Sequence, residues 1–411
     1  MHFLHPQKNS KNILYLSYDG MLEPLGESQV LGYLTKMCQD RDFEFTLISF
    51  EKRQDLLDHD HLKRIRDLCA ANGIHWIPLP YHKNPVLLAT AWDILVCTFR
   101  AFFILMKKDI EIIHARSYVA SVPALFLKLL CRKKFIFDMR GFWADERADA
   151  GQWPRSGRIY KSVKWFEKQF LTRADAVVSL THSGVDEMKR FDYLKSAQPT
   201  FAVIPTCVDL EKFRPKAIRS ESDGLPFLLG HIGSIGSWYL FDEAVLFFKA
   251  LKEIEPKAKL LIVNRNEHER ILQILTRLQV SEDSYILRSA NHDEMPEIIS
   301  QLSASVFFIK SFYSKKASAP TKFAELMSCG IPCVVNAGVG DMDLFFNDQT
   351  IGVSVSSYDA VTFRHAALML LKIIRDPKTL EICRSTALRS FSVSQGARDY
   401  LNLYRQILLR R

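Results

Sequence analysis

The sequence lacks several patterns that mark common classes of protein. None of its eight cysteines forms a C-x-x-C pair and most lie inside apolar runs, so we expect reduced core residues of a cytosolic protein rather than a disulfide framework or a zinc site. The first twelve residues, MHFLHPQKNSKN, contain no apolar signal region, and we expect a protein that is not secreted. No low-complexity segment or short repeat interrupts the chain, which favours ordinary globular domains.

The sequence also lacks a long apolar run that is free of charge. Its most apolar stretch, 87–106, carries Asp93 and Arg100 in its interior, which a membrane-spanning helix rarely tolerates. Lys107 and Lys108 follow, with further basic residues at 132–134. This pattern is typical either of a core-facing crossover helix or of a basic, aromatic surface that rests on anionic lipid. We expect the second, in a cytoplasmic protein attached peripherally to the inner face of the membrane.

Length and charge bound the function further. The 411 residues suit two α/β domains, and 48% hydrophobic with 25% charged residues is ordinary for a globular protein. The formal charge of +9 suits an anionic partner, such as a phosphorylated ligand or an acidic lipid surface. We expect no nucleic-acid partner, because the sequence shows no recognised basic and aromatic module.

Short apolar β-type runs alternate with longer helical patterns, which predicts an α/β fold with parallel, doubly wound sheets. The expected strands of the first half are 13–17, 45–50, 74–78, 112–114, 135–138, 176–180 and 201–205. The expected helices between them are 28–40, 55–72, 86–107, 119–131 and 158–173. The pattern then restarts, with strands 227–232, 259–264, 284–288, 304–310, 332–336 and 352–355.

A polar segment at 206–223, with a proline and a charge cluster, is the expected linker. We therefore predict an N-terminal domain over 1–208, a C-terminal domain over 209–390, and a helix over 391–411 that packs back toward the first domain. Ligands of open parallel sheets bind beyond the carboxyl ends of the strands, so the loops there are where we expect the site.

The most informative segment is SAPTKFAELMSCGIPCVVN, residues 318–336. Pro320 suits the first turn of a helix, Gly330 suits its C-terminal cap, and the helix start offers free backbone N–H groups to a diphosphate. Lys322 adds a cation there, and Glu325 can accept both hydroxyls of a ribose. The alternative is a capped surface helix whose lysine and glutamate, three residues apart, merely pair.

This segment resembles the donor-binding helix of the retaining family-4 glycosyltransferases (glycosyl transferases group 1) of the GT-B fold. The stretches IPTCVDLEKFRP at 204–215 and ADAVVSLTHSGVDEM at 174–188 resemble the interdomain segment and the last N-domain strand and helix of that family. The resemblance implies two Rossmann-like domains that face each other across a cleft. It also implies transfer of a hexose from a UDP- or GDP-linked donor, with retention of configuration, to a glycan or lipid-linked acceptor in cell-surface polysaccharide or glycolipid synthesis.

The resemblance also implies roles for single residues in this segment. Ser318, Thr321, Lys322 and Glu325 would bind the donor, and Lys322 would in addition stabilise the leaving diphosphate. The family commonly has an earlier glutamate, which would fall at Ala317 and is missing here. Its absence leaves the identity of the sugar open.

A second segment, GHIGSIGSWYLFDE at 230–243, resembles the glycine loop that opens the C-domain of the family. Gly233, Ser234 and Gly236 would approach the donor, although pairs of this kind are often only turns. The family's usual Lys-Gly is replaced by SWY at 237–239. Arg265, at the end of the next expected strand, is the candidate for a second phosphate cation or else a solvated loop arginine.

Candidates in the N-domain follow its expected strands. Gly20 lies in a flexible loop, 18–31, that would face the donor phosphates, or in an ordinary connection whose Ser28 caps the next helix. In FDMRGFWADE at 137–146, Asp138 stands about where many relatives have a histidine. The predicted catalytic residues of this domain are Asp138 and Arg140, and the predicted acceptor-binding residues are His114, Arg116, Trp143, Asp145 and Glu146. The alternative is an ion pair that anchors the loop.

No D-x-D pair ends a predicted strand, so we expect no metal and no cofactor besides the nucleotide-sugar substrate. The cations would be the protein's own. Two other functions stay open: a sugar-nucleotide epimerase of the same architecture, and a non-catalytic nucleotide-binding relative, which the missing glutamate supports.

Overall fold

The computed structural model describes residues 10–196, 198–215, 227–348 and 350–410. The chain forms two compact units. The N-terminal unit contains Met1–Ala148, Trp153–Pro205 and Val393–Arg411, and the C-terminal unit contains Asp149–Gln152 and Thr206–Ser392. The chain thus changes unit after Pro205 and returns after Ser392. Part of the predicted linker, 216–223, lies outside the described residues.

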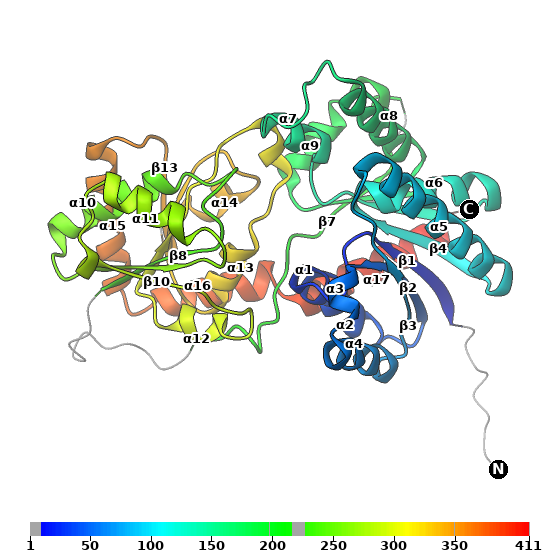
Figure 1. Ribbon diagram of the computed structural model, residues 1–411, viewed down its shortest axis with the longest axis horizontal. Coiled ribbons are helices and arrows are strands. Elements are labelled where there is room, and N and C mark those ends of the chain that lie inside the picture. The colour runs from blue at the N-terminus through cyan, green and yellow to red at the C-terminus, as the bar shows by residue number, and fades with distance from the viewer. Residues whose placement is uncertain (1–9, 197, 216–226, 349, 411) are drawn as a thin grey trace, which may run out of the picture. The chain divides into compact units, whose positions relative to one another are not determined.

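The N-terminal unit is built on a seven-stranded parallel sheet of order β3-β2-β1-β4-β5-β6-β7 (Figure 1). Its strands are β1 Lys11–Ser17, β2 Phe43–Glu51, β3 His75–Pro80, β4 Ile110–Arg116, β5 Lys134–Asp138, β6 Ala176–Ser179 and β7 Thr200–Val203. All seven predicted strands are therefore present. The central strands are buried on both faces, as crossover helices on a parallel sheet require.

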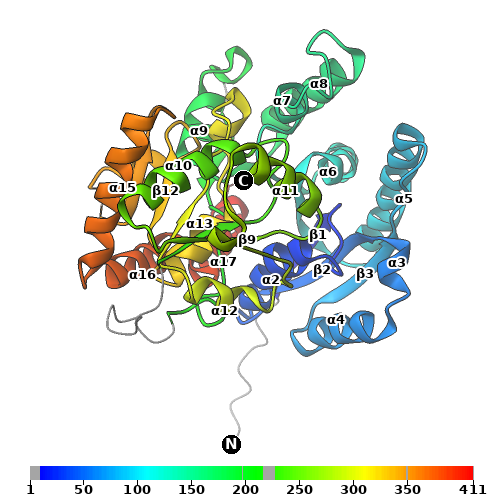
Figure 2. The same cartoon turned by 60° about the vertical axis from the view of Figure 1, so that its left-hand side comes forward.

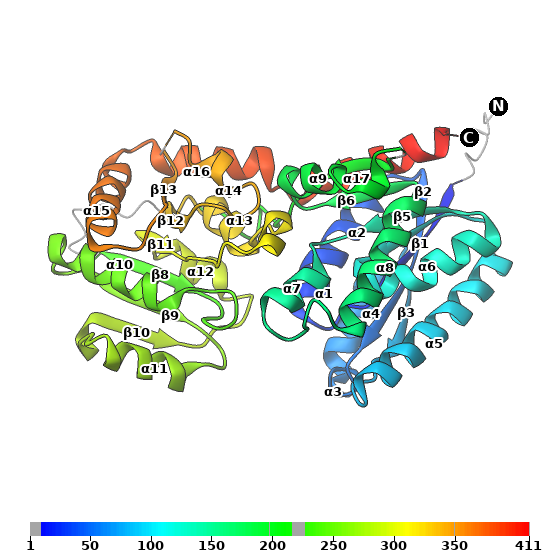
Figure 3. The ribbon, with the colours of Figure 1, turned by 90° about the horizontal axis from the view of Figure 1, so that it is seen from above.

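Long helices cover this sheet. They are α4 His59–Ala71, α5 Val86–Lys107, α6 Ser117–Cys131, α7 Trp143–Asp149, α8 Arg158–Arg173, α9 His182–Lys189 and α17 Val393–Leu409. The observed bounds of α5 and α8 are the predicted ones. Figure 3 shows α5 and α6 on one side of the sheet and α17 on the other.

The connection after β1 differs from the prediction. The expected helix 28–40 consists of α1 Pro24–Gly26, a π-helical turn over Glu27–Leu31 (η1) and α2 Gly32–Met37. The helical turn therefore begins at Pro24, and Ser28 does not cap it. Its hydroxyl instead donates to the carbonyl of Pro24, 2.7 Å away, from inside the helical segment.

The C-terminal unit has a six-stranded parallel sheet of order β10-β9-β8-β11-β12-β13. Its strands are β8 Leu228–Ile232, β9 Lys259–Val263, β10 Tyr285–Arg288, β11 Ala304–Val306, β12 Cys333–Asn336 and β13 Gly352–Val355. Its helices are α10 Phe241–Ile254, α11 His268–Arg277, α12 Met295–Ser300, α13 Thr321–Ser328, α14 Met342–Phe345, α15 Ala360–Arg375 and α16 Thr379–Ser390. Figures 1 and 2 both show α10 and α15 packed side by side.

Two details of this unit correct the sequence prediction. The strand expected at 304–310 ends at Val306, although Ile309 still forms a single bridge with Tyr239. Pro320 is the N-cap of α13 rather than a residue of its first turn, and Thr321 begins the helix. Gly330 has a φ of 78°, so it ends α13 in the left-handed conformation that suits glycine.

Candidate active site

The predicted donor residues of the C-terminal unit gather where β8 ends and α13 begins. The ammonium of Lys322 donates to the carbonyl of Ile232, 2.6 Å away, and lies 3.8 Å from the ring centre of Tyr239. Gly233 follows with a φ of 99°, and a Cβ there would lie 3.2 Å from the Lys322 nitrogen. Glycine at this position therefore leaves room beside the lysine.

The start of α13 has no internal cap. Pro320 is the N-cap and has no side-chain oxygen with which to accept a hydrogen bond from the first turn. Ser318 and Thr321 are half-buried on either side of it. Free N–H groups and the positive end of the helix dipole thus lie beside Lys322, which is an arrangement suited to an anion.

Glu325, one turn further along α13, is buried and has no hydrogen-bond partner among the described residues. Burial raises the pKa of Glu325 to about 7, opposed by the charges of Lys322 and Lys212. A carboxylate that is desolvated and unpaired in the free protein costs stability, so its presence needs a reason. A bound ligand with hydroxyl donors would supply the missing partners.

The glycine loop after β8 is held by Glu267, which the sequence analysis did not single out. Its carboxylate accepts hydrogen bonds from the Ser234 hydroxyl at 2.8 Å, the Ile235 N–H at 3.0 Å and the Asn264 amide at 2.9 Å. A Cβ on Gly236 would lie 2.9 Å from a Glu267 oxygen. The loop is therefore packed, and glycine at position 236 leaves room for the Glu267 carboxylate.

Arg265 lies on the same edge of the sheet but faces a different loop. Its side chain donates to the carbonyl of Ala290 at 3.1 Å and to the amide oxygen of Asn291 at 3.3 Å. The residue is exposed. The structure therefore does not bring the Arg265 guanidinium into contact with Lys322.

In the N-terminal unit, the ends of β4 and β5 carry a buried cluster of charged and aromatic side chains. Asp138 and His114 are fully buried, and Arg116 is 3% exposed. The Tyr400 hydroxyl of α17 donates to the Asp138 carboxylate at 2.9 Å, and the Tyr404 hydroxyl lies 2.6 Å from Nδ1 of His114. The last helix of the chain thus completes this cluster.

The charges in this cluster compensate one another. Burial alone would raise the pKa of Asp138, but Arg140, His114 and Arg116 together lower it to about 2. The guanidiniums of Arg116 and Arg140 each lie 3.8 Å from its carboxylate. Asp138 is therefore ionised at neutral pH. It holds two arginines and does not itself reach the surface.

The members of the cluster that do reach solvent are Asp19 and Arg140. Asp19 accepts a hydrogen bond from Nε of Arg116 at 3.2 Å, and its side chain is 39% exposed. Arg140 has a φ of 60°, an uncommon conformation for a residue other than glycine, and its NH1 has no hydrogen-bond partner among the described residues. Asp19 was not predicted as a site residue, and only its place in the loop 18–31 pointed to it.

The remaining acceptor candidates lie on α7. Trp143 packs against Tyr118 and Trp153, at centroid distances of 5.6 and 5.1 Å. Both oxygens of buried Asp145 are occupied, one by the Tyr160 hydroxyl at 2.7 Å and the other by Lys164 at 3.0 Å. Asp145 therefore fastens α7 to α8, while Glu146 is half-buried.

The first loop of this unit is fixed rather than flexible. Glu51 is buried at the end of β2 and accepts hydrogen bonds from the backbone N–H groups of Met21 at 2.9 Å and Leu22 at 3.0 Å. A Cβ on Gly20 would lie 2.6 Å from the Glu51 carboxylate, and one on Gly26 only 1.9 Å from the carbonyl oxygen of Gly20. Both glycines are thus required by close packing.

Comparison with models of protein families identifies the family of this chain. A model described as Glycosyltransferase Family 4 matches residues 26–212, and a model described as Glycosyl transferases group 1 matches residues 215–389. In the sequence, the first match ends and the second begins between β7 and β8, and together they cover most of the chain. The chain belongs to glycosyltransferase family 4.

Solved structures agree on the fold of this glycosyltransferase. A glycosyltransferase from Rickettsia africae ESF-5 matches with a TM-score of 0.69 at 17% identity, covering 98% of this chain and 100% of that one. Sucrose-phosphate synthase from Thermosynechococcus elongatus matches with a TM-score of 0.69 at 16% identity over 98% and 100%. HepE of Anabaena, solved in complex with UDP and glucose, matches with a TM-score of 0.63 at 14% identity over 96% and 99%.

These likenesses, with the two parallel α/β sheets, show that the glycosyltransferase has the GT-B fold. A search of curated proteins found no match. The residues of this glycosyltransferase that sequence reasoning missed are Asp19, Glu51, Glu267, Tyr400 and Tyr404. Each contacts a candidate residue or its loop from a distant position in the chain, and a local motif does not show such a contact.

Proposed function

We propose that this glycosyltransferase moves a hexose from a nucleotide diphosphate-sugar to a glycan or lipid-linked acceptor with retention of configuration. The observation that carries the proposal is Glu325, a buried carboxylate without a described hydrogen-bond partner, one turn from Lys322 and the uncapped start of α13. A nucleotide diphosphate has the two groups that this arrangement needs: ribose hydroxyls to donate to Glu325, and an anion for Lys322 and the helix start.

Lys322 is proposed to act mainly on the leaving diphosphate. Its ammonium has three N–H donors, and the carbonyl of Ile232 takes one of them. The remaining donors can bind phosphate oxygens as negative charge develops on them. With the dipole of α13, this lysine supplies the positive charge for which other enzymes use a metal ion, and we propose that no metal takes part.

The donor is proposed to be UDP- or GDP-linked. Complexes of HepE with UDP and glucose and with UDP-glucose support a uridine nucleotide, since HepE shares the fold of this chain. The acceptor is proposed to bind the N-terminal unit near Arg140 and Asp19, with Asp138 as the buried residue that holds Arg140 in place. We place the reaction in polysaccharide or glycolipid synthesis, at the cytoplasmic face of a membrane.

A thermal-shift screen tests the donor. UDP, GDP and ADP, each alone and as the glucose conjugate, should separate by base, because a ligand at one hundred times its Kd stabilises the fold by about 2.7 kcal/mol. The preferred donor is then incubated with acceptors, and NMR of the product reports the anomer. An inverted anomer would contradict retention. Conversion of the donor sugar without any acceptor would instead indicate an epimerase.

A further inference from the structure

In α5 the large apolar side chains are exposed and the small or polar ones are buried, which is the opposite of an ordinary surface helix. Its buried positions, which face the rest of the unit, are small or polar: Ala89, Asp93, Cys97 and Ala101. Its exposed positions are large and apolar: Leu88 at 71%, Trp92 at 54%, Leu95 at 46%, Phe99 at 57%, Phe103 at 58% and Met106 at 69%. They recur every three or four residues and therefore form one stripe along the helix.

The neighbouring helix extends this stripe. Near the C-terminal end of α6, Phe126, Leu129 and Leu130 are 53%, 58% and 70% exposed. Figures 1 and 3 both show α5 and α6 side by side, and the two helices are in contact. These nine side chains are called the α5–α6 face below. Contiguous apolar surface of this kind on a folded protein marks a site of interaction.

The charges of this surface have one sign. No acidic residue occupies an exposed position of α5, whose only acidic residue, Asp93, is fully buried. Arg100 lies on the flank of the stripe, Lys107 follows Met106, and Arg132 follows the end of α6, all exposed. Asp109, the nearest exposed carboxylate in sequence, pairs with Lys133 at 3.0 Å.

We propose that the α5–α6 face docks into the headgroup and upper acyl region of an anionic lipid bilayer, with α5 lying in the plane of the membrane. Apolar and aromatic side chains flanked by Lys and Arg are the features by which interfacial helices bind such a surface. The basic residues meet anionic headgroups, while Trp92, Phe99 and Phe103 enter the apolar boundary.

The helix is long and apolar enough to cross a membrane by length and composition, but its contacts oppose spanning. The carboxylate of Asp93 accepts a hydrogen bond from the Tyr18 hydroxyl at 2.9 Å and from the His82 N–H at 3.2 Å, and it lies 2.6 Å from Nδ1 of His82. Crossing the bilayer would break these bonds and place the carboxylate in hydrocarbon. An in-plane helix keeps them.

A second copy of the chain fits this face less well. In a two-fold symmetric dimer the same patch meets itself, so the basic residues of one copy would lie close to those of the other. No exposed acidic residue of α5 could pair with Arg100 or Lys107 in such an interface. An anionic bilayer, in contrast, attracts these charges.

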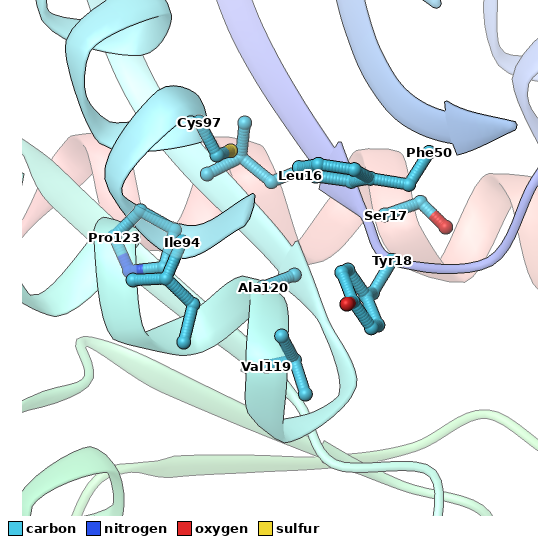
Figure 4. A pocket seen from close by; sticks show the side chains of 9 residues that line it. All are labelled: Leu16, Ser17, Tyr18, Phe50, Ile94, Cys97, Val119, Ala120 and Pro123. Carbon is cyan, nitrogen blue, oxygen red and sulfur yellow. The ribbon is translucent and has the colours of Figure 1, made fainter. Parts of the chain in front are cut away.

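The α5–α6 face begins at the carboxyl edge of the N-terminal sheet, near the proposed acceptor site. Because α5 follows β3, its N-terminal end lies at the carboxyl edge of the sheet, and Asp93 is bonded there to Tyr18, the residue before Asp19. Tyr18 also lines a small apolar pocket with Ile94, Cys97 and Val119, where α5 and α6 meet the end of β1 (Figure 4). Docking would thus bring a lipid-borne acceptor to this edge, a consequence that rests on the proposed function.

Vesicle flotation of the full chain tests docking without donor or acceptor. We expect the protein to float with phosphatidylcholine vesicles that contain phosphatidylglycerol at low salt. Phe99→Ser with Phe103→Ser should weaken partition about a hundredfold or more, because two buried Phe side chains at roughly 1.5 kcal/mol each contribute about 3 kcal/mol. Lys107→Gln with Arg132→Gln should lose about fivefold for each charge on anionic vesicles, since each contributes about 1 kcal/mol, and nothing on neutral ones.

The matched control removes two exposed apolar side chains elsewhere. Val361 and Leu388 of the C-terminal unit are 80% and 52% exposed, and Val361→Ser with Leu388→Ser should leave flotation unchanged. Wild-type protein that stays unbound on anionic vesicles at low salt overturns the proposal. The proposal is also overturned if light scattering shows a dimer of the wild type and a monomer of Phe99→Ser with Phe103→Ser. Thermal stabilisation by UDP, measured on the same proteins, shows separately whether the proposed function holds.

Discussion

The carboxyl edges of the two sheets carry charged residues in opposite states. In the N-terminal unit, Asp138 and Arg116 are buried together and compensate each other, and a helix from the far end of the chain closes over them. In the C-terminal unit, Glu325 is buried without a hydrogen-bond partner among the described residues, and Lys322 contacts one carbonyl and the rings of two aromatic residues. Residues that compensate one another's charge form a platform, although Oδ1 of Asp138 and NH1 of Arg116 make no hydrogen bond among the described residues. Glu325 has no ion pair or hydrogen bond among the described residues and is available to a ligand.

Removing the buried carboxylate of the platform should have the largest effect. Asp138→Asn leaves the two arginines without their counter-charge, and breaking a buried pair in this way costs about 3–5 kcal/mol. Because the pKa of Asp138 is lowered to about 2, its stabilisation is present above pH 4 and is lost as pH falls toward 2. Hydrogen exchange of β4 and β5 amides measures the loss.

Asp186→Asn is the matched control for this change. Asp186 is an exposed residue of the same unit and pairs with Lys189 at 3.8 Å. Surface pairs contribute at most about 1 kcal/mol, so this variant should keep the protection of β4 and β5. Equal protection of the β4 and β5 amides in Asp138→Asn and Asp186→Asn would show that the buried cluster does not stabilise these strands.

Removing the Lys322 ammonium from the C-terminal unit should affect turnover more than donor binding. Lys322→Ala should lower kcat by about 10²–10³-fold, because a donor aimed at developing charge acts mainly in the transition state. Lys316→Ala removes a cation from the neighbouring 3₁₀ segment, where it lies 5.3 Å from the ring centre of Tyr313, and should leave kcat unchanged. A Lys322→Ala enzyme with normal kcat and weaker donor binding would make this lysine a binding residue only.

Glu325→Gln should change how the stability of the protein depends on pH. The pKa of Glu325 is raised to about 7, so wild-type stability falls as pH rises from about 4.5 to 7, where the folded protein holds a proton that the unfolded chain releases. The variant should match wild type near pH 4.5 and exceed it by roughly 3 kcal/mol at pH 8, the free energy of a shift from 4.5 to about 7.

The same variant should bind UDP more weakly, by roughly 1.5–3 kcal/mol, since it loses a charged acceptor for the ribose. For the wild type, affinity should rise between pH 6 and 8, because the ionised carboxylate is the form that binds. Calorimetry at these pH values decides the point. A pH-independent affinity in the wild type would argue against a contact between Glu325 and the ribose.

The smallest expected effect concerns the tyrosines of α17. Tyr400→Phe removes a hydrogen bond to ionised Asp138 and should cost about 1.5 kcal/mol, whereas Tyr404→Phe removes one to neutral His114 and should cost about 1 kcal/mol or less. Denaturant unfolding of both variants measures the difference. A larger loss from Tyr404→Phe would mean that His114, and not Asp138, organises the cluster.

Local patterns predicted the elements well. Strand 352–355 and helices 86–107 and 158–173 have the predicted bounds, because apolar periodicity and flanking turns report each element separately. The π-helical turn at Glu27–Leu31 was missed, since a packed glycine pair, Gly20 and Gly26, rather than a capping residue determines that connection.

The candidate site could be predicted only where its residues lie in one motif. Lys322 and Glu325 lie on one helix and were found together, whereas Glu51, Glu267 and Tyr400 hold site residues from 30 or more positions away. The exposed face of α5 was predicted as apolar, but which side faces solvent depends on the sheet beneath it. Such relations exist only once the chain is folded.

The place of α17 has a consequence for synthesis on the ribosome. Tyr400 and Tyr404 close the charged cluster of the N-terminal unit, yet they emerge only after the whole C-terminal unit has been translated. During that interval the first unit holds Asp138, Arg116 and His114 without the helix that seals them. A premature stop codon just before Val393 would therefore leave every residue of the C-terminal unit in the chain and remove the helix that the unit made first requires.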